Sequence, residues 1–168
     1  MQEPALPEAK EKALRGWARS QGTNPQAQTL KRACDTVIGA NHKQAIVTLV
    51  QRKSGYALIA KVSNKTADLV GAAIISMLNP FEARVKTLTY DNAKEFCGHA
   101  KIDDALNSTG YFARPFASWE RGSNENFNGL LRQYVPKKRL METVTEEEVK
   151  MIENRLNNRP RKRLGFKT

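Results

Sequence analysis

Residues 33–62 constrain the fold most strongly, because three apolar runs follow one another there with only short polar turns between them. The runs extend from Ala33 to Ile38, from Gln44 to Val50 and from Tyr56 to Val62, and each intervening turn contains a glycine. Apolar runs of strand length with such short connections are typical of neighbouring antiparallel strands. The sequence therefore predicts that the fold begins with a three-stranded meander.

Helical and strand-like patterns alternate after this meander. Apolar residues repeat at helical spacing over residues 67–78, and Pro80 ends the pattern. The remaining expected elements are a strand from Arg84 to Tyr90, a helix from Lys94 to Asn107 with Phe96, Ala100, Ala105 and Leu106 inward, a short strand from Tyr111 to Phe116, a helix from Gly122 to Pro136, and a helix from Thr145 to Pro160. This order predicts an α/β fold in a single domain of residues 31–168. Residues 1–30 are rich in Ala, Gln, Pro, Lys and Glu, which predicts a mostly disordered lead-in.

The charge balance favours a polyanionic partner. The chain has 28 basic and 17 acidic side chains, a net charge of +11, with dense basic clusters at 137–139 and 159–163. Ordinary solubilising charge is the alternative explanation. The sequence shows neither an apolar run of membrane-spanning length nor a signal peptide, and its two cysteines are expected to be reduced thiols. We therefore expect a cytoplasmic protein with no membrane partner.

The predicted helix after Gly122 has two distinct faces. Its apolar stripe consists of Phe127, Leu130, Leu131 and Tyr134. Glu125 lies about 160° from that stripe at roughly 100° per residue, and Arg121, Gly129 and Arg132 share its face. The helix is therefore expected to bury its aromatic side and to present a glutamate and two arginines outward.

Three acidic residues on separate predicted elements suggest a metal site. Asp35 lies in the first apolar run, Asp91 ends a strand, and Glu125 lies at the start of the helix described above. Mg²⁺ prefers such hard oxygen ligands, and two ions can stabilise the attacking and leaving oxygens of a displacement at phosphorus. The alternatives are an exposed edge position for Asp35, an Asp-Asn turn for Asp91, and a surface pair of Glu125 with Arg121 that contributes only about 0.3–0.5 kcal/mol.

Three sequence blocks carry a resemblance to a known family. They are Thr89-Tyr90-Asp91-Asn92-Ala93-Lys94-Glu95-Phe96, the stretch from Pro115 to Leu130 with Ser118-Trp119-Glu120-Arg121-Gly122 inside it, and the stretch from Leu156 to Lys162. In this order they resemble the DDE transposases of bacterial insertion sequences, which are relatives of retroviral integrases. The resemblance covers about Asp35 to Thr168. Two positions depart from it, since Arg32-Ala33-Cys34 stands where the family has Trp-Glu and a small residue, and Ala93 replaces a glycine.

The resemblance implies a fold, a reaction and a set of partners. The fold would be a ribonuclease-H-like mixed sheet of about five strands covered by helices. Asp35, Asp91 and Glu125 would be the catalytic residues and the ligands of two Mg²⁺ or Mn²⁺ ions in a polynucleotidyl transferase, with water as the nucleophile for cleavage and a DNA 3′-hydroxyl for joining. We also expect DNA as the partner, a homo-oligomer on DNA, no small-molecule cofactor, and a nucleoid-associated location in a bacterium. The expected DNA-binding residues are Arg121, Asn124, Asn128, Arg132, Lys137, Lys138, Arg159, Arg161 and Lys162.

Two other functions remain open at this point. A catalytically degenerate, DNA-binding remnant of a transposase would account for the unmatched residues 1–30, for Ala93 and for Arg32-Ala33-Cys34. A ribonuclease H acting on RNA–DNA hybrids would share the fold but would not explain the block around Trp119. Family members carry a helix-turn-helix region ahead of the core, and too few residues precede Asp35 to hold one. The expectation is therefore a truncated chain that does not locate the ends of its element by itself.

Overall fold

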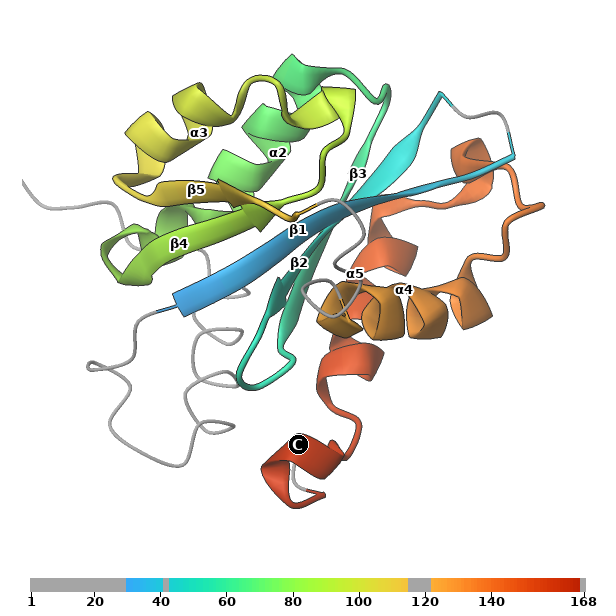
Figure 1. Ribbon diagram of the computed structural model, residues 1–168. Helices are drawn as coiled ribbons and strands as arrows, with labels where there is room; N and C mark the ends of the chain where they lie inside the picture. The colour runs from blue at the N-terminus through green and yellow to red at the C-terminus, as the bar shows by residue number, and fades with distance from the viewer. Residues whose placement is uncertain (1–29, 41–42, 115–121, 167–168) are drawn as a thin grey trace, which may run out of the picture.

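The computed structural model describes residues 30–40, 43–114 and 122–166 (Figure 1). The expectation of a disordered lead-in therefore falls almost entirely outside the described residues. The strands are β1 (Leu30–Ile38), β2 (Ala45–Gln51), β3 (Ala57–Val62), β4 (Val85–Tyr90) and β5 (Thr109–Phe112). The α-helices are α2 (Ala67–Leu78), α3 (His99–Leu106), α4 (Gly122–Tyr134) and α5 (Glu146–Asn157), and the 3-10 segments are η1 (Asn79–Arg84), η2 (Lys94–Phe96), η4 (Met141–Thr143) and η5 (Lys162–Leu164).

The strands form one mixed sheet of five strands in the order β3-β2-β1-β4-β5. The first three strands pair antiparallel, as the short glycine-containing turns predicted, whereas β1 pairs with β4 and β4 with β5 in parallel. Parallel neighbours need crossover connections. The chain reaches β4 from β3, at the far edge of the sheet, through the segment with α2 and η1. The expected α/β fold with a mixed sheet of about five strands is confirmed.

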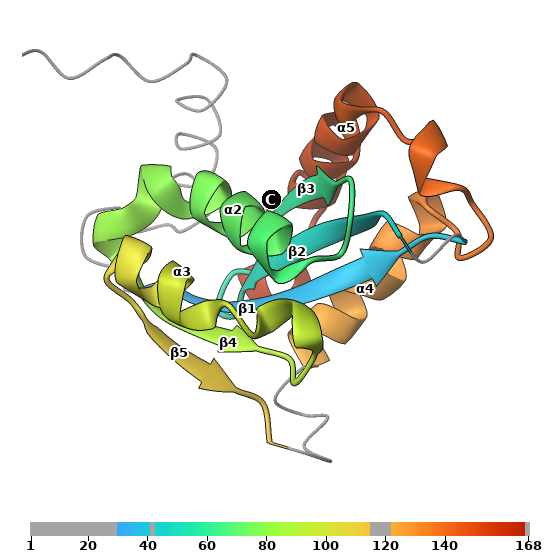
Figure 2. The same cartoon turned by 90° about the horizontal axis from the view of Figure 1, so that it is seen from above.

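Helices cover both faces of the sheet (Figures 1 and 2). On one face α2 and α3 bury a core that includes Leu49, Ile74 and Leu88. On the other face α4 packs on β1 and β2 while α5 packs on β3, with Val37 and Phe127 in the second core. Since side chains alternate along a strand, the odd-numbered residues of β1 around Val37 face α4.

Two expected elements differ from the structure. The helix expected from Lys94 to Asn107 is divided into η2 and α3, because Gly98 separates them and forms the N-cap of α3. The expectation that Ala100 and Ala105 face inward was wrong, since Ile102 is the buried residue of that face together with Leu106. The strand expected from Tyr111 begins earlier, at Thr109, and residues 115–116 lie outside the described part of the chain.

Side chains of helix α5 form hydrogen bonds with the backbone of β3, the edge strand of the sheet. Asn157 accepts a hydrogen bond from the Ala57 amide at 2.9 Å and donates one to the Ala57 carbonyl at 2.7 Å. Glu153 accepts a hydrogen bond from the Ile59 amide at 2.7 Å, and its burial raises its pKa to about 7. Because β3 is an edge strand, these contacts take the place of a neighbouring strand. None of the described helices is long and apolar enough to span a membrane.

We predict that Asn157→Ala destabilises the protein by about 1–3 kcal/mol, because it leaves a buried backbone donor and acceptor of Ala57 without partners. Urea unfolding followed by circular dichroism measures the change. The matched control is Asn154→Ala, an exposed asparagine of the same helix, which should change the stability by less than about 0.5 kcal/mol. Equal effects of the two substitutions would contradict the role given to Asn157.

Candidate active site

Asp35 lies on β1, and Asp91 directly follows β4, the parallel neighbour of β1. The β1–β4 pairing sets Arg32 opposite Leu88 and Ala33 opposite Thr89. The pairing ends at Ala33 and Thr89, so Asp35 and Asp91 each lie two residues beyond the last paired position of their segment. Asp35 belongs to the sheet face that α4 covers, because its carboxylate contacts Asn128 of that helix. Asp91 follows the end of the neighbouring strand. The fold therefore brings together two acids that are far apart in the sequence.

The carboxylate of Asp35 is held by helix α4. Asp35 is only 9% exposed, and its Oδ2 atom accepts a hydrogen bond from Asn128 Nδ2 at 2.9 Å. The hydroxyl of Thr48, opposite Asp35 on β2, lies 3.3 Å from both the Asp35 carbonyl oxygen and Asn128 Oδ1. A buried carboxylate is costly unless it is paired or hydrogen-bonded, and Asn128 supplies such a bond. Asn128, expected to contact DNA, thus also orients the first acid.

Asp91 is positioned by the chain segments that follow β4 and β5. Its Oδ1 atom accepts a hydrogen bond from the Asn92 amide at 2.7 Å, and Asn92 Nδ2 donates to the Ala113 carbonyl at 2.7 Å. Ala113 in turn donates its amide to the Tyr90 carbonyl at 2.9 Å. These bonds tie the end of β4 to the end of β5. The Asp-Asn turn, considered above as an alternative to a ligand, therefore fixes the position of Asp91 and is compatible with that role.

Glu125 is presented by an amphipathic helix. Phe127 and Leu131 are buried against the sheet, and each contributes about 1.5–3 kcal/mol to holding α4 in place. Glu125 is exposed in the first turn, as the helical projection predicted. It lies three residues before Asn128, and residues at that spacing are neighbours on a helix surface. Helix α4 thus carries Glu125 on the side from which Asn128 reaches Asp35.

The three acids provide ligands of the type that a magnesium ion prefers. Carboxylate oxygens suit Mg²⁺, and two carboxylates on adjacent strands repel each other unless a cation lies between them. Among the described residues, however, no group of three acidic, histidine or cysteine side chains is close enough to hold a metal ion. The arrangement thus consists of a carboxylate pair, Asp35 and Asp91, with Glu125 carried on the adjoining helix.

Glu95 is a further acid of this region and has a structural role. It is 6% exposed, accepts a hydrogen bond from Thr36 Oγ1 at 2.7 Å, and pairs with Lys65 at 2.8 Å. Burial favours a higher pKa for Glu95, but the hydrogen bonds from Lys65 and Thr36 outweigh it and hold the pKa below its usual value. Glu95 thus fixes the residue that follows Asp35 in β1. No sequence pattern indicated the ion pair, because Lys65 lies outside every recognisable motif.

The expected DNA-binding residues differ in how far they are exposed. Arg121 lies outside the described residues, and Asn124 is buried at 2% exposure, so Asn124 is not presented at the surface. Lys137 and Lys138 are exposed after α4, and Arg132 is half-buried on the face of Glu125, where burial lowers its pKa.

The C-terminal cations line a cavity beside the start of α4. Arg159, Arg161, Lys162 and Arg163 contribute to its wall, together with Ser123 from the first turn of α4, and the cavity volume is about 350 Å³. Arg161 is 5% exposed, and its Nη2 donates a hydrogen bond to the Asn157 carbonyl at 2.9 Å. The basic cluster of residues 159–163 is thus partly buried, since Arg161 is held inside the fold.

The two departures from the family pattern are accommodated differently. Ala93 has a φ of −93° and a ψ of 149°, an ordinary extended conformation, so alanine replaces glycine there without backbone strain. Arg32 is fully buried over the Phe81 ring, 5.5 Å from its centroid, and burial lowers its pKa to about 10. Its guanidinium nitrogens have no hydrogen-bond partner within the part of the chain that the structure describes.

We predict that Glu95→Gln destabilises the protein at pH 7 by about 1–3 kcal/mol, because it removes charged hydrogen bonds to Lys65 and Thr36. The folded-state pKa lies below the unfolded value, so this stabilisation is present above about pH 4 and is lost as the pH falls through the folded pKa. Urea unfolding of both proteins at pH 7 and pH 3 measures the difference. Glu82→Gln, an exposed control, should show none at either pH, and a Glu95 effect that persists at pH 3 would contradict the assignment.

Comparison with known proteins shows sequence relatives among transposases. The chain is 48% identical over 134 residues to the transposase for insertion sequence element IS4351 of Bacteroides fragilis. It is 40% identical over 136 residues to transposase InsI for insertion sequence element IS30A of Escherichia coli K12. Each match covers 80% of this chain but only 41% and 35% of the two relatives, so the chain corresponds to part of them. No protein-family model matches the chain.

A solved structure shares the fold. The catalytic core domain of BIV integrase superposes with a TM-score of 0.61 at 19% sequence identity, covering 83% of this chain and 90% of that domain. At this identity the likeness establishes the fold alone.

Proposed function

Because this chain is homologous over four fifths of its length to part of the insertion-sequence transposases, and has the fold of an integrase catalytic core, we propose that it is the catalytic domain of a transposase. The proposed reaction is metal-dependent cleavage and joining of DNA phosphodiesters. The proposed domain comprises residues 31–168.

One observation carries this proposal. Asp35 and Asp91 each lie two residues beyond the last paired residues of the neighbouring strands β1 and β4, and Asn128 connects Asp35 to the helix that bears Glu125. Two acids from distant parts of the sequence thus lie at the same end of neighbouring parallel strands, and the helix that carries the third acid contacts the first. A purely structural role would not require Asp35 to be buried there, since burying a carboxylate costs free energy.

The residues present suggest how the chain would act on a phosphodiester. Asp35, Asp91 and Glu125 would hold two divalent ions, which when bound activate a nucleophile and neutralise charge that develops on the phosphate. Asn128 keeps the Asp35 carboxylate in one orientation. Thr48 fixes Asn128 in turn, at 3.3 Å from its Oδ1 atom. The exposed Lys137 and Lys138 would contact the DNA backbone. The nucleophile would be water for cleavage and a DNA 3′-hydroxyl for joining.

A DNA-binding remnant without catalysis is the second candidate function. It is favoured by the lack, among the described residues, of a group of three acids within reach of one metal ion. The ordinary backbone of Ala93 removes one argument for it, because no strain arises there. A cleavage assay separates the two candidates.

We predict that the purified chain nicks supercoiled DNA in Mn²⁺ and that Glu125→Gln and Asp35→Asn each reduce the rate at least a hundredfold. Each substitution removes a charged metal ligand but preserves the size of the side chain. Gel electrophoresis of the plasmid gives the rate, and circular dichroism confirms folding. The control is Glu142→Gln, an exposed glutamate between α4 and α5, which should cut at the parental rate. If Glu125→Gln cuts as fast as the parent, Glu125 is not a ligand.

Binding to duplex DNA should depend steeply on salt, because neutralising the phosphates releases counterions. The slope of log affinity against log salt is negative. Replacing both Lys137 and Lys138 by alanine should make it less steep by about 2, roughly one for each phosphate that is no longer neutralised. Fluorescence anisotropy between low and moderate salt measures the slope. Lys150→Ala on α5 is the control and should leave it unchanged. A parental affinity that does not vary with salt would exclude binding dominated by phosphates.

A further inference from the structure

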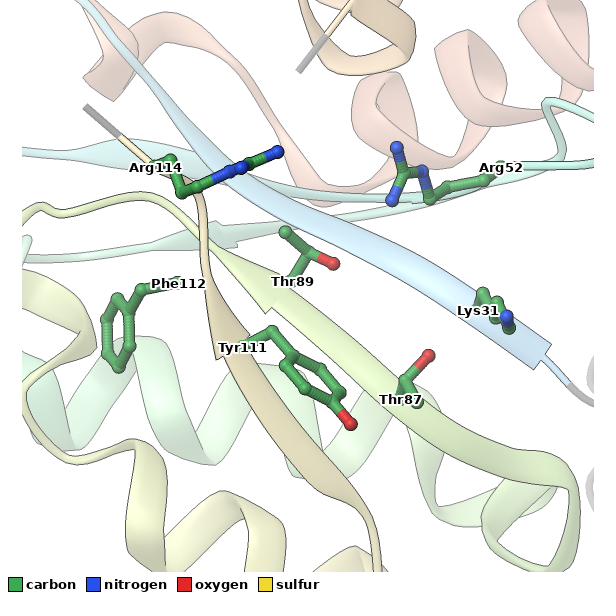
Figure 3. Close-up of a pocket in the computed structure, with 7 residues that line it drawn as sticks. All are labelled: Lys31, Arg52, Thr87, Thr89, Tyr111, Phe112 and Arg114. Atoms are coloured by element: carbon green, nitrogen blue, oxygen red, sulfur yellow. The ribbon is translucent and has the colours of Figure 1, made fainter. Parts of the chain in front are cut away.

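A groove runs along the same sheet face as the carboxylate pair. Its volume is about 590 Å³. Helices α4 and α5 lie over β1, β2 and β3 rather than over β4 and β5, so the groove follows a part of the face to which neither extends (Figure 1). The described residues that line it are Lys31, Arg52, Thr87, Thr89, Tyr111, Phe112 and Arg114 (Figure 3).

The groove leads along the strands to the carboxylate pair. Lys31 pairs with Thr87, and Thr89 pairs with Tyr111. Asp35 lies four residues beyond Lys31 in β1, and Asp91 lies two residues beyond Thr89, directly after β4. The path from the Lys31 level to the Asp35 level is four residues, or about 13 Å at 3.3 Å per residue.

The lining has the two properties that a DNA strand requires. Lys31, Arg52 and Arg114 bring three positive charges to the groove, and no carboxylate is among its described lining residues. Figure 3 shows the two guanidinium groups extending toward each other over β1 from opposite ends. Positive charge gathered along a groove is suited to consecutive phosphates.

Tyr111 supplies an aromatic surface for a base. Its side chain is 54% exposed, and Figure 3 shows its ring lying on the groove side of β5. The neighbouring Phe112 ring is directed away and packs edge-on against His99, with ring centroids 4.8 Å apart. An exposed aromatic ring beside cations is typical of platforms on which unpaired bases stack.

Hydrogen bonds fix one end of the groove. The Arg52 amide donates to the Lys31 carbonyl at 3.0 Å, and Arg163 Nη1 donates to the Arg52 carbonyl at 3.0 Å. The turn that carries Arg52 is thus attached both to β1 and to the C-terminal basic cluster. The backbone at the Arg52 end of the groove is therefore fixed before a ligand binds, which lowers the entropy cost of binding there.

We propose that this groove binds an unpaired stretch of the DNA strand that adjoins the reacting phosphodiester. Tyr111 stacks on one base, and Lys31, Arg52 and Arg114 neutralise the phosphates that flank it. An unpaired strand fits better than a duplex, because in a duplex each base face is covered by its neighbours and cannot stack on Tyr111. Binding of a single strand in the groove stands on these residues alone, whereas its position beside the reacting phosphate rests on the proposed function.

The test compares binding of a labelled twelve-nucleotide oligothymidine and a duplex of the same length, by fluorescence anisotropy at low salt. Tyr111→Ala should weaken oligothymidine binding about 5- to 150-fold, the contribution of one stacked base, and leave duplex binding unchanged. Tyr111→Phe keeps the ring and should bind as the parent does. Lys31→Glu should also weaken oligothymidine binding, whereas Lys150→Glu, the same charge change on α5, should not.

Two outcomes would overturn the proposal. One is that Tyr111→Ala binds oligothymidine as tightly as the parent. The other is that Tyr111→Ala weakens oligothymidine and duplex equally, which would make the groove a duplex site. Plasmid nicking by the same preparations distinguishes this failure from failure of the proposed function. If the parent nicks DNA but Tyr111→Ala does not change oligothymidine affinity, only the groove proposal fails. If the folded parent binds oligothymidine through Tyr111 but never nicks DNA, the groove proposal stands and the proposed catalytic function fails.

Discussion

The parallel pairing of β1 with β4 is the constraint on which the rest of the site depends. These strands are separated in the sequence by the antiparallel hairpin partners β2 and β3 and by α2. A shift of one residue in their register would turn every side chain of one strand to the opposite face. Cys34 and Leu88 are buried on the α2 face, and this burial opposes such a shift. The packing of one core thus determines that Asp35 faces the other side of the sheet and that Asp91 follows the end of the neighbouring strand.

Helix α4 contributes the third part of the arrangement through its two faces. Phe127 and Leu131 anchor it on the sheet, and Asn128 contacts Asp35 from the boundary between the buried and exposed sides. This amide lets a carboxylate be buried at a sheet position where it would otherwise be unfavourable. It also couples the placement of Asp35 to that of Glu125 one turn earlier. Packing, hydrogen bonding and the candidate chemistry are therefore linked within a single helix.

The sequence predicted most of the fold because its signals were local. Glycine-containing turns identified the β1–β2–β3 meander, and helical spacing identified α2, α4 and α5. The division of the 94–107 segment was missed, because one glycine, Gly98, outweighed a run of helix-forming residues. The helical periodicity of α4 also correctly placed Glu125 on the exposed side.

The contacts between distant segments could not be predicted in this way. The Lys65–Glu95 ion pair and the attachment of Asn157 to β3 join residues whose partners lie far away in the sequence. The same applies to the groove beside β5, since a single exposed tyrosine and scattered basic residues have no pattern of their own. Asn124, expected at the surface, is buried because the first turn of α4 packs more deeply than the apolar stripe alone indicated.

We propose that Asp35 and Asp91 share a metal ion to which Glu125 also contributes. Crystals of the chain soaked in Mn²⁺ and measured at a wavelength where manganese scatters anomalously test it most directly. We expect an anomalous peak between the Asp35 and Asp91 carboxylates, with Glu125 oxygens directed to the same region. Well-ordered carboxylates with no anomalous peak between them at saturating Mn²⁺ would contradict it.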